Sequence, residues 1–393
     1  MTFKPATRTV RAGIDSDTAN GAVIPPITLS ATYRFADLDD QPRYDYTRCG
    51  NPTRDALANA LADLEGGAGA VVTASGMGAI ATVLHALLAP GERLLAPHDC
   101  YGGSWRLFTA LAARGLFEFE TCDFHDPAQL GAALERRPQL VWIETPSNPL
   151  LRITDLEAVI GAARAVGALT VADNTFLSPA LQRPIEFGAD VVVHSTTKYL
   201  NGHSDVVGGA AVARDPAVLE QLLWWANALG VTGAPFDSYL TLRGLRTLNA
   251  RMRIHQENAA AIAALLDGHS AVARVHYPGL AAHPGHAIAA RQQDGFGAML
   301  SFELAGGEAA VRAFVDGLAC FTLAESLGGV ESLVAYPLTM SNAAMSEEAR
   351  ERAGIGLGLL RLSIGIEHMD DLAADLAAAL DRALAATSEA VRC

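Results

Sequence analysis

The sequence predicts an α/β fold, with a large domain built on a mostly parallel sheet and a smaller α+β domain toward the C-terminal end. Short apolar runs alternate with helical patterns over the first part of the chain, which is typical of parallel strands covered by helices on both faces. This pattern changes after about residue 255, where helical segments surround a single strand. The 393 residues exceed what one hydrophobic core usually supports, so about two domains and an extension are expected.

We expect an extended N-terminal arm at residues 1–60, an α/β domain at residues 61–255 and an α+β domain at residues 256–393. The arm contains VIPPITLSATYRF and YDYTRCGNPTR, which are punctuated by Pro and Gly and show no clear periodicity. A segment of this kind typically packs on a neighbour, so the arm is expected to contact an adjacent subunit.

Five apolar runs bounded by turn residues are the predicted strands of the larger domain: residues 70–73, 93–96, 140–144, 169–173 and 191–194. The first run is followed by a helical face whose apolar residues recur at buried spacing: Met77, Ile80, Val83, Leu84, Leu87 and Leu88. A further helix is predicted to start at Thr154, where Glu157 completes a capping box, and to end at Gly167. The uncharged stretch between Glu65 and Glu92 is therefore interpreted as strand, turn and helix rather than as a membrane span.

In the smaller domain, helices are expected around residues 257–266 and 309–318, with a strand at residues 298–303 between them. The last predicted helix covers residues 369–385, with one leucine stripe made of Leu372, Leu376, Leu380 and Leu384.

The charge balance of 29 Lys+Arg against 43 Asp+Glu gives a formal net charge of −14. Binding to nucleic acid or to anionic membranes depends on clustered basic residues, so neither partner is expected.

The five scattered cysteines form no CxxC pair, and no HExxH-type histidine pair occurs, so no metal site is expected. Free thiols and the lack of a secretory signal at the N-terminus favour a cytoplasmic location.

The strongest candidate for chemistry is Lys198, which follows an apolar strand in ADVVVHSTTKYLNGHSD. A lone lysine after a strand is more often a solvated flank. Here the hydroxyl residues Ser195 and Thr197 precede it at a strand's carboxyl end, where phosphate oxygens can be bound. A sheltered lysine at such a place is suited to form a Schiff base with a carbonyl.

Three further features lie near strand ends. In TASGMGA, glycine lets backbone N–H groups such as those of Gly76 and Met77 approach an anion at a helix start, although tight packing turns use glycine as often. Asp173 ends a strand and is either a helix cap or a partner that keeps a pyridine nitrogen protonated. Tyr101 is either an ordinary half-buried tyrosine or a ring that stacks on a flat cofactor. Together with Lys198 these features specify pyridoxal 5′-phosphate.

The chain resembles the Cys/Met-metabolism family of pyridoxal-phosphate-dependent enzymes. The resemblance covers nearly the whole length and rests on specific motifs: YDYTRCGNPTR, ASGMGA, APHDCYGGSWRLF, ETPSNPLL, VADNTFLSPALQ, HSTTKYLNGHSDVVGG, GAPFDSYLTLRGLRTL, FTLAESLGGVESL and LLRLSIGIE. It implies the aspartate-aminotransferase-like architecture, fold type I.

The resemblance also implies residue roles. Lys198 would bind the cofactor aldehyde and later move protons, Asp173 would pair with the ring nitrogen, and Tyr101 would stack on the ring. The phosphate would be held by four residues of the same chain: Gly76, Met77, Ser195 and Thr197. Tyr46 and Arg48 of the arm would reach the cofactor phosphate of a neighbouring subunit, which implies a homotetramer made of two active dimers.

For the substrates, the resemblance implies that Arg361 takes the α-carboxylate, with Asn148 near the cofactor ring and Ser326 beside Lys198. Glu325 is a candidate for the amino group of the second substrate, and Arg106 for a distal carboxylate. For Glu325 and Arg106 an ordinary surface or structural ion pair is equally compatible with the sequence.

Within the family, WWANALGVTGAPFDSYL and GFGAMLSFEL are most similar to the bacterial enzymes that replace the succinyl group of O-succinyl-L-homoserine with L-cysteine, giving L-cystathionine and succinate. The alternatives within the family are cleavage of cystathionine on its γ or β side, and direct sulfhydrylation of an O-acylhomoserine. An α/β binding protein without catalysis is a further alternative, but a binder does not require the Schiff-base lysine.

Two segments depart from the family's usual pattern. Ser341 and Asn342 stand where relatives commonly carry a Thr-His pair, and Ile364 and His368 stand where Val or Thr and Asp are usual. The first departure lies near the expected substrate entrance, so it bears on acyl or thiol preference.

Overall fold

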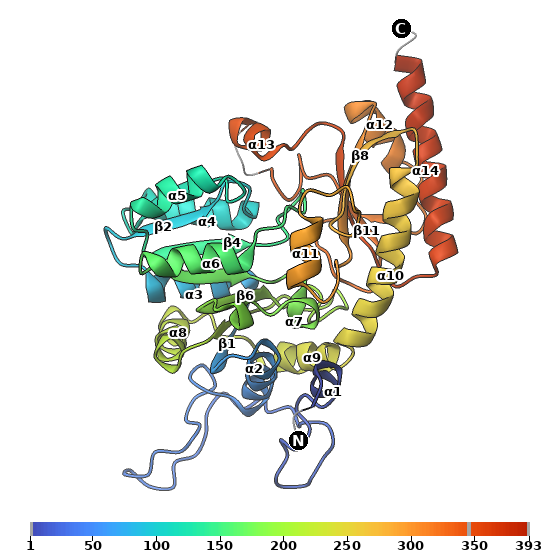
Figure 1. The fold of residues 1–393 in the computed structure, drawn as a ribbon. Coiled ribbons are helices and arrows are strands. Elements are labelled where there is room, and N and C mark those ends of the chain that lie inside the picture. Colours follow the sequence, from blue (N-terminus) through green and yellow to red (C-terminus); the bar gives the residue numbers. More distant parts are fainter. Residues whose placement is uncertain (1–2, 344–346, 391–393) are drawn as a thin grey trace.

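The computed structural model describes residues 3–343 and 347–390. Cys393, one of the five cysteines, lies outside the described residues. The fold is built around two sheets, one in each half of the molecule (Figure 1).

The larger sheet has seven strands in the order β1-β7-β6-β5-β4-β2-β3. Their bounds are β1 Gly69–Thr73, β2 Arg93–Pro97, β3 Glu118–Cys122, β4 Leu140–Glu144, β5 Leu169–Asp173, β6 Val191–Ser195 and β7 Gly209–Ala213. All neighbouring strands are parallel except β7, which is antiparallel to both β1 and β6. The five predicted runs are all strands, with ends within one residue of the prediction, and the mostly parallel sheet is confirmed.

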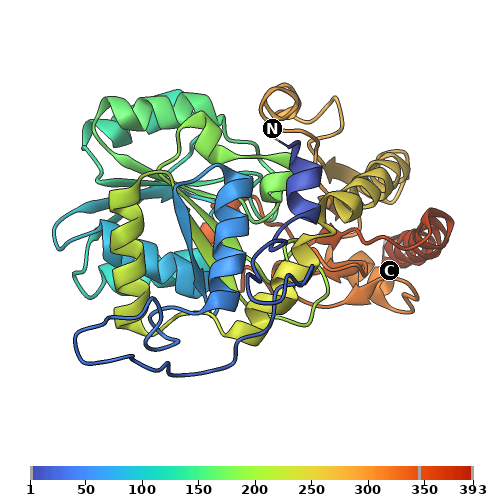
Figure 2. The same ribbon diagram turned by 90° about the horizontal axis from the view of Figure 1, so that it is seen from below.

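Helices lie on both faces of this sheet (Figure 2), and each face has its own apolar core. One core includes Leu61 of α2 and Ile160 of α6, and the other includes Val83 of α3 and Leu222 of α8. The helical segments of this half are α2 Pro52–Glu65, α3 Gly76–Leu87, α4 Gly102–Ala112, α5 Pro127–Glu135, α6 Leu156–Ala165, α7 Ser178–Leu181, η1 Pro184–Phe187, α8 Pro216–Leu229 and α9 Pro235–Leu245. The uncharged stretch is β1 followed by α3, as predicted.

The start of α6 corrects one detail of the prediction. Asp155, not Thr154, is the N-cap, because its carboxylate accepts the N–H of Ala158. Thr154 instead donates its backbone N–H to Oγ1 of Thr145 at 3.1 Å. The helix ends before Gly167, whose φ of 83° is the left-handed conformation that glycine adopts readily.

The smaller sheet has five strands in the order β10-β11-β12-β9-β8. Their bounds are β8 Val272–His276, β9 Met299–Leu304, β10 Thr322–Leu323, β11 Leu333–Ala335 and β12 Leu359–Ser363. The accompanying helices are α10 Leu248–Asp267, α11 His286–Gln292, α12 Gly307–Val315, α13 Glu347–Ala353 and α14 Met369–Ala390. The predicted strand is β9, shifted by one residue, and the helices predicted at residues 257–266 and 369–385 lie in α10 and α14. The helix predicted at residues 309–318 is α12, which ends earlier, at Val315. Leu372, Leu376 and Leu380 are buried, but Leu384 at the end of the predicted stripe is exposed.

The first sixty residues are only partly extended. A short helix, α1 Pro5–Val10, precedes the loops, and α2 begins at Pro52 and packs against β1. Between these helices the chain forms loops that project from the larger half (Figure 1), and apolar side chains such as Leu29 and Leu38 are exposed there. Across residues 3–343 and 347–390, no helix combines the length and apolar character needed to cross a membrane.

Candidate active site

A cavity of about 310 Å³ lies at the carboxyl ends of β4, β5 and β6, where the larger half meets β12 of the smaller sheet. The place agrees with the rule that open α/β sheets bind ligands at this edge. Most of the predicted site residues line this cavity: Gly76, Met77, Tyr101, Asn148, Asp173, Ser195, Thr197, Lys198, Glu325, Ser326 and Arg361.

Lys198 follows β6 and points its Nζ at the hydroxyl of Ser326, to which it donates a hydrogen bond of 2.7 Å. Burial, helped by the positive charge of Arg361, lowers the pKa of Lys198 to about 8. The side chain is therefore an amine with a substantial neutral fraction near neutral pH, as a nucleophile or proton carrier requires. The chain has only one other lysine, Lys4, which is exposed near the N-terminus.

Asp173 is the last residue of β5, and its Oδ1 accepts the backbone N–H of Thr175 at 3.0 Å. Burial raises the pKa of Asp173, and the hydrogen bonds from Thr175 oppose that rise. Glu144 lies beside it at the end of β4, where burial and the neighbouring Asp173 raise the pKa of Glu144 well above its usual value. Two buried acids next to each other are costly unless a cationic or proton-donating group joins them, so this pair favours a protonated ligand atom.

Tyr101 precedes α4 and donates its backbone N–H to Oε2 of Glu144 at 2.8 Å. A side chain at Gly103 would collide with the Tyr101 ring, so the glycine leaves room for the ring against the start of α4. Burial and the negative charge of Glu325 raise the pKa of Tyr101, so its hydroxyl stays protonated at neutral pH.

The start of α3 forms a narrow cradle beside β6. Ser75 is the N-cap and accepts the N–H of Gly78 at 3.0 Å, while the N–H groups of the first turn have no acceptor within the helix. A Cβ at Gly76 would lie 2.9 Å from Cβ of Ser195, so a larger residue would push into this space. The hydroxyl of Thr197 is held by the backbone N–H of Gly208 at 3.0 Å. Backbone donors and hydroxyls around a helix N-terminus suit a phosphate group.

Arg361 of β12 is 3% exposed, and its guanidinium donates to two neutral groups. Nη1 donates to Oδ1 of Asn148 at 2.9 Å, and Nη2 donates to the backbone oxygen of Ser326 at 2.9 Å. Nε is buried without a partner, and burial lowers the pKa of Arg361 to about 10. A buried guanidinium at the wall of a cavity is suited to an incoming carboxylate.

Tyr46, Arg48 and Arg106 do not line the cavity. Tyr46 is exposed, and Arg48 donates to the backbone oxygen of Asn227 at 3.0 Å and to the side-chain oxygen of the same residue. Arg106 is exposed on α4. Its positive charge acts to lower the pKa of Tyr101, against the larger effect of burial.

The prediction missed several residues that line the cavity or support its walls. Glu144 and Thr175 were not singled out, although each lies at or just after a predicted strand end. Asp173-Asn174-Thr175 also has the spacing at which an aspartate accepts a backbone N–H two residues later, which was a usable signal. Ser341, one of the departures from the family pattern, lines the cavity as well. Among the described residues no His, Cys, Asp and Glu cluster is arranged to hold a metal ion.

These residues fit pyridoxal 5′-phosphate. Lys198 supplies a buried amine for its aldehyde, and Asp173, beside Glu144 in the cavity wall, supplies a carboxyl group for a pyridinium nitrogen. The cradle at Gly76 lines the cavity and has no space for a side chain, so backbone N–H groups can approach a phosphate there.

The comparisons with known proteins agree with this geometry. The family model for "Cys/Met metabolism PLP-dependent enzyme" matches residues 6–381. The cystathionine gamma-synthase of Escherichia coli (strain K12) is 57% identical over 376 residues, which are 96% of this chain and 97% of that protein. The cystathionine beta-lyase of Coxiella burnetii is 46% identical, over 95% of this chain and 97% of that protein.

Solved structures give the same grouping. The crystal structure of cystathionine gamma synthase from Xanthomonas oryzae pv. oryzae in complex with cystathionine matches with a TM-score of 0.97 and 68% identity, covering 98% of this chain and 100% of that chain. The cystathionine gamma-lyase from Lactobacillus plantarum, complexed with L-serine, matches with a TM-score of 0.94 and 41% identity, covering 97% of this chain and 100% of that chain. This chain therefore has the same fold as both structures, and its sequence identity to the synthase is higher than its identity to the lyase.

Proposed function

The chain belongs to the Cys/Met metabolism family of PLP-dependent enzymes, and from this premise we propose that it replaces the succinyl group of O-succinyl-L-homoserine with L-cysteine. The products are L-cystathionine and succinate, the reaction of a cystathionine γ-synthase. The observation that carries the proposal is the cavity that brings together the partly neutral amine of Lys198 and the buried guanidinium of Arg361. The identity to the Escherichia coli and Xanthomonas oryzae synthases, 57% and 68%, exceeds that to the Coxiella burnetii and Lactobacillus plantarum lyases, 46% and 41%, which favours replacement over cleavage.

Bound pyridoxal phosphate supplies an aldehyde that condenses with amines and a ring that accepts electrons from the substrate's Cα. We propose that Lys198 holds its aldehyde, Asp173 its ring nitrogen and Tyr101 one face of the ring. The phosphate would be held by the cradle residues: Gly76, Met77, Ser195 and Thr197. Because burial favours the protonated form of Asp173, the ring nitrogen and Asp173 can share a proton across one hydrogen bond.

Lys198 then serves as the proton carrier for the substrate. Its Nζ removes the proton from Cα, and the hydroxyl of Ser326, 2.7 Å from Nζ, keeps the amine aimed into the cavity. Proton transfer by a positioned side chain is worth about 10²–10⁴-fold in rate. Arg361 holds the α-carboxylate and Asn148 fixes the guanidinium plane, so Cα is presented in one orientation.

Two charged residues nearer the mouth of the cavity are proposed to select the substrates. Glu325 is exposed at the cavity wall, where its carboxylate suits the amino group of cysteine. Arg106 is exposed on α4, outside the cavity lining, where it suits the distal carboxylate of the succinyl group. Ser341 lies in the same wall and is proposed to shape the space between these two groups.

We further propose that the protein is a cytoplasmic homotetramer in which Tyr46 and Arg48 complete a neighbouring subunit's phosphate site. The exposed apolar side chains of the arm support an interface there, since water does not favour such surface.

The test is a comparison of two incubations of the purified holoenzyme, with products identified by mass spectrometry. One contains O-succinyl-L-homoserine and L-cysteine, and the other contains L-cystathionine alone. We expect faster formation of cystathionine in the first than release of pyruvate or 2-oxobutyrate in the second. The reverse ranking would assign the chain to the lyases, and sulfide acting as a better acceptor than cysteine would assign it to the O-acylhomoserine sulfhydrylases.

A further inference from the structure

We propose that Arg152 is a positioning residue for substrate binding: it fixes the loop that carries Asn148 and thereby orients the guanidinium of Arg361. The proposal rests on the role proposed above for Arg361. Arg152 does not line the cavity, so any effect on the substrate must pass through the residues that it holds.

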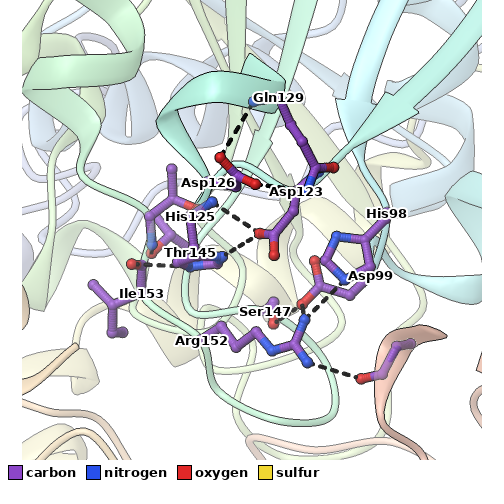
Figure 3. Close-up of polar contacts among 12 residues, drawn as sticks. His98, Asp99, Asp123, His125, Asp126, Gln129, Thr145, Ser147, Arg152 and Ile153 are labelled. Carbon is purple, nitrogen blue, oxygen red and sulfur yellow. Dashed lines mark hydrogen bonds and ion pairs between the residues drawn. The ribbon is translucent and has the colours of Figure 1, made fainter. Parts of the chain in front are cut away.

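Arg152 joins its own loop to two segments that are distant in the sequence (Figure 3). Its Nη1 donates to Nε2 of His98 at 2.9 Å and lies 3.5 Å from Oδ2 of Asp99, both just after β2. Its Nη2 donates to the backbone oxygen of Ala353, the last residue of α13, at 3.2 Å. Because arginine can only donate, Nε2 of His98 must be the unprotonated nitrogen of its ring.

Asp99 also binds the first residue of the loop at residues 147–152. Ser147 donates its hydroxyl to Oδ2 of Asp99 at 2.8 Å, as Figure 3 also shows, and its backbone N–H to the oxygen of Arg152 at 2.9 Å. The start and the end of residues 147–152 are therefore tied both to each other and to Asp99. Asn148 is the next residue after Ser147, so its side chain starts from a fixed backbone.

The charges make this arrangement costly to disturb. Asp99 is 4% exposed, and it forms an ion pair with Arg152. Removing Arg152 would leave a buried carboxylate without its cation, which destabilises the local structure strongly. The loop would then relax away from Asp99, and Asn148 would move with it.

The loop reaches the cavity at Asn148, which lines the cavity and contacts Arg361. Oδ1 of Asn148 accepts from Nη1 of Arg361 at 2.9 Å, and together with the bond from Nη2 to the backbone oxygen of Ser326 it sets the plane in which the guanidinium faces a ligand. Two-point binding of a carboxylate depends on that plane. Loosening Arg152 should therefore weaken the grip on the α-carboxylate and leave the amine chemistry of Lys198 intact.

Binding measurements on the holoenzyme can separate positioning from general stability. L-norleucine has the α-amino group and α-carboxylate but no leaving group, whereas pentylamine has the amine alone. For Arg152→Met we expect about tenfold weaker binding of norleucine, the loss of roughly one well-placed charged hydrogen bond, with binding of pentylamine unchanged. The KM for O-succinyl-L-homoserine should rise by a similar factor, with kcat changed by less than about threefold.

Arg183→Met is the matched control. Arg183 also bridges separate segments, through Glu186, Asp294 and the backbone oxygen of Pro179, but none of these residues lines the cavity. It should lower the melting temperature without changing the ratio of norleucine to pentylamine binding. Arg152→Lys keeps a positive charge for Asp99 but cannot reach His98 and Ala353 together, so it should keep near-normal stability with an intermediate norleucine affinity.

Equal weakening of both ligands, or an equal effect of Arg183→Met, would overturn the proposal, as would an unchanged norleucine affinity in both Arg152 variants. The ligand comparison does not depend on turnover, so it remains informative even if the chain fails to form cystathionine. That failure would concern the proposed reaction and not the role of Arg152.

Discussion

At the scale of single residues, Lys198 owes its chemistry to its surroundings. Burial and the charge of Arg361 lower its pKa to about 8, below the usual value near 10.5. The neutral amine is the form that attacks an aldehyde, so its fraction rises with pH and levels off above that pKa. The rate at which the cofactor-free protein takes up pyridoxal phosphate should therefore climb to about pH 8 and be nearly constant above about pH 9. Stopped-flow absorbance measures this rate, and a climb that continues past about pH 10 would show an unperturbed lysine.

The small number of lysines makes the covalent assignment directly testable. Lys198→Ala should reduce turnover by at least about 10²–10⁴-fold and abolish the visible absorption of the bound cofactor, because no other buried amine can replace it. Lys4→Ala should change neither, since Lys4 is exposed near the N-terminus. After borohydride reduction of the wild-type holoenzyme, peptide mass mapping should find the cofactor on Lys198. Label on Lys4 alone, or an unaltered spectrum in Lys198→Ala, would refute the assignment.

At the scale of elements, the first turn of α3 tests the phosphate cradle. Gly76→Ala would place Cβ 2.9 Å from Cβ of Ser195, which narrows the space between the helix start and β6. We expect about tenfold or greater loss of cofactor affinity, measured by dialysis of the holoenzyme, because backbone donors must approach the phosphate closely. Gly78→Ala is the control: its nearest neighbour would be Oγ of Ser75 at 3.4 Å, an ordinary contact, and affinity should be unchanged. Equal losses in both variants would mean that the helix as a whole, and not the cradle, was disturbed.

Elements with strong local patterns could be predicted from the sequence, and those that depend on distant partners could not. The five predicted strands are buried apolar runs, whereas β3 at the sheet edge reads EFETC and β7 reads GAAVA, with little strand propensity. A side chain at Gly209 of β7 would collide with the backbone of Ser75, so close packing explains the small residues there. At α6, Asp155 is the N-cap in place of Thr154, whose backbone N–H is bonded to the side chain of Thr145.

The residues of the candidate site also differ in whether they could be predicted from local sequence patterns. Lys198 and Asp173 could be found because each ends a recognisable strand and carries a distinctive group. The electrostatic setting could not, because Arg361 meets Asn148 across 213 positions of sequence and Lys198 meets Ser326 across 128. Such contacts follow from how the two sheets pack together, which no local pattern specifies. The placement of Tyr46 and Arg48 remains a prediction, since it concerns a neighbouring subunit.

At the scale of the whole molecule, the arm decides whether one chain is sufficient for activity. The cavity of a single chain is lined without Tyr46 or Arg48, and Arg48 is bound to Asn227 at the surface. If the arm completes a neighbour's cavity, two inactive variants should complement each other, because a hybrid dimer of Lys198→Ala and Arg48→Ala contains one cavity without either lesion. Random assortment from equal co-expression puts half of the dimers in hybrid form, so about a quarter of all cavities should be intact.

We therefore expect the co-expressed pair to recover about a quarter of wild-type activity per cavity, while each variant alone, and a mixture of the two without subunit exchange, stays inactive. The matched control places both changes on one chain and co-expresses it with wild type. There each hybrid keeps one Lys198 but loses the arm that serves it, so hybrids should contribute nothing and only wild-type dimers should be active. The alternative is that the arm serves the cavity of its own chain. Every cavity in the co-expressed pair then carries one lesion, so no activity is recovered. In the control, each hybrid dimer then keeps one intact cavity. Hybrid dimers are therefore active only in the first co-expression if the arm serves a neighbour, and only in the control if it serves its own chain. Sedimentation analysis of the same samples reports whether the active species is a dimer or a tetramer.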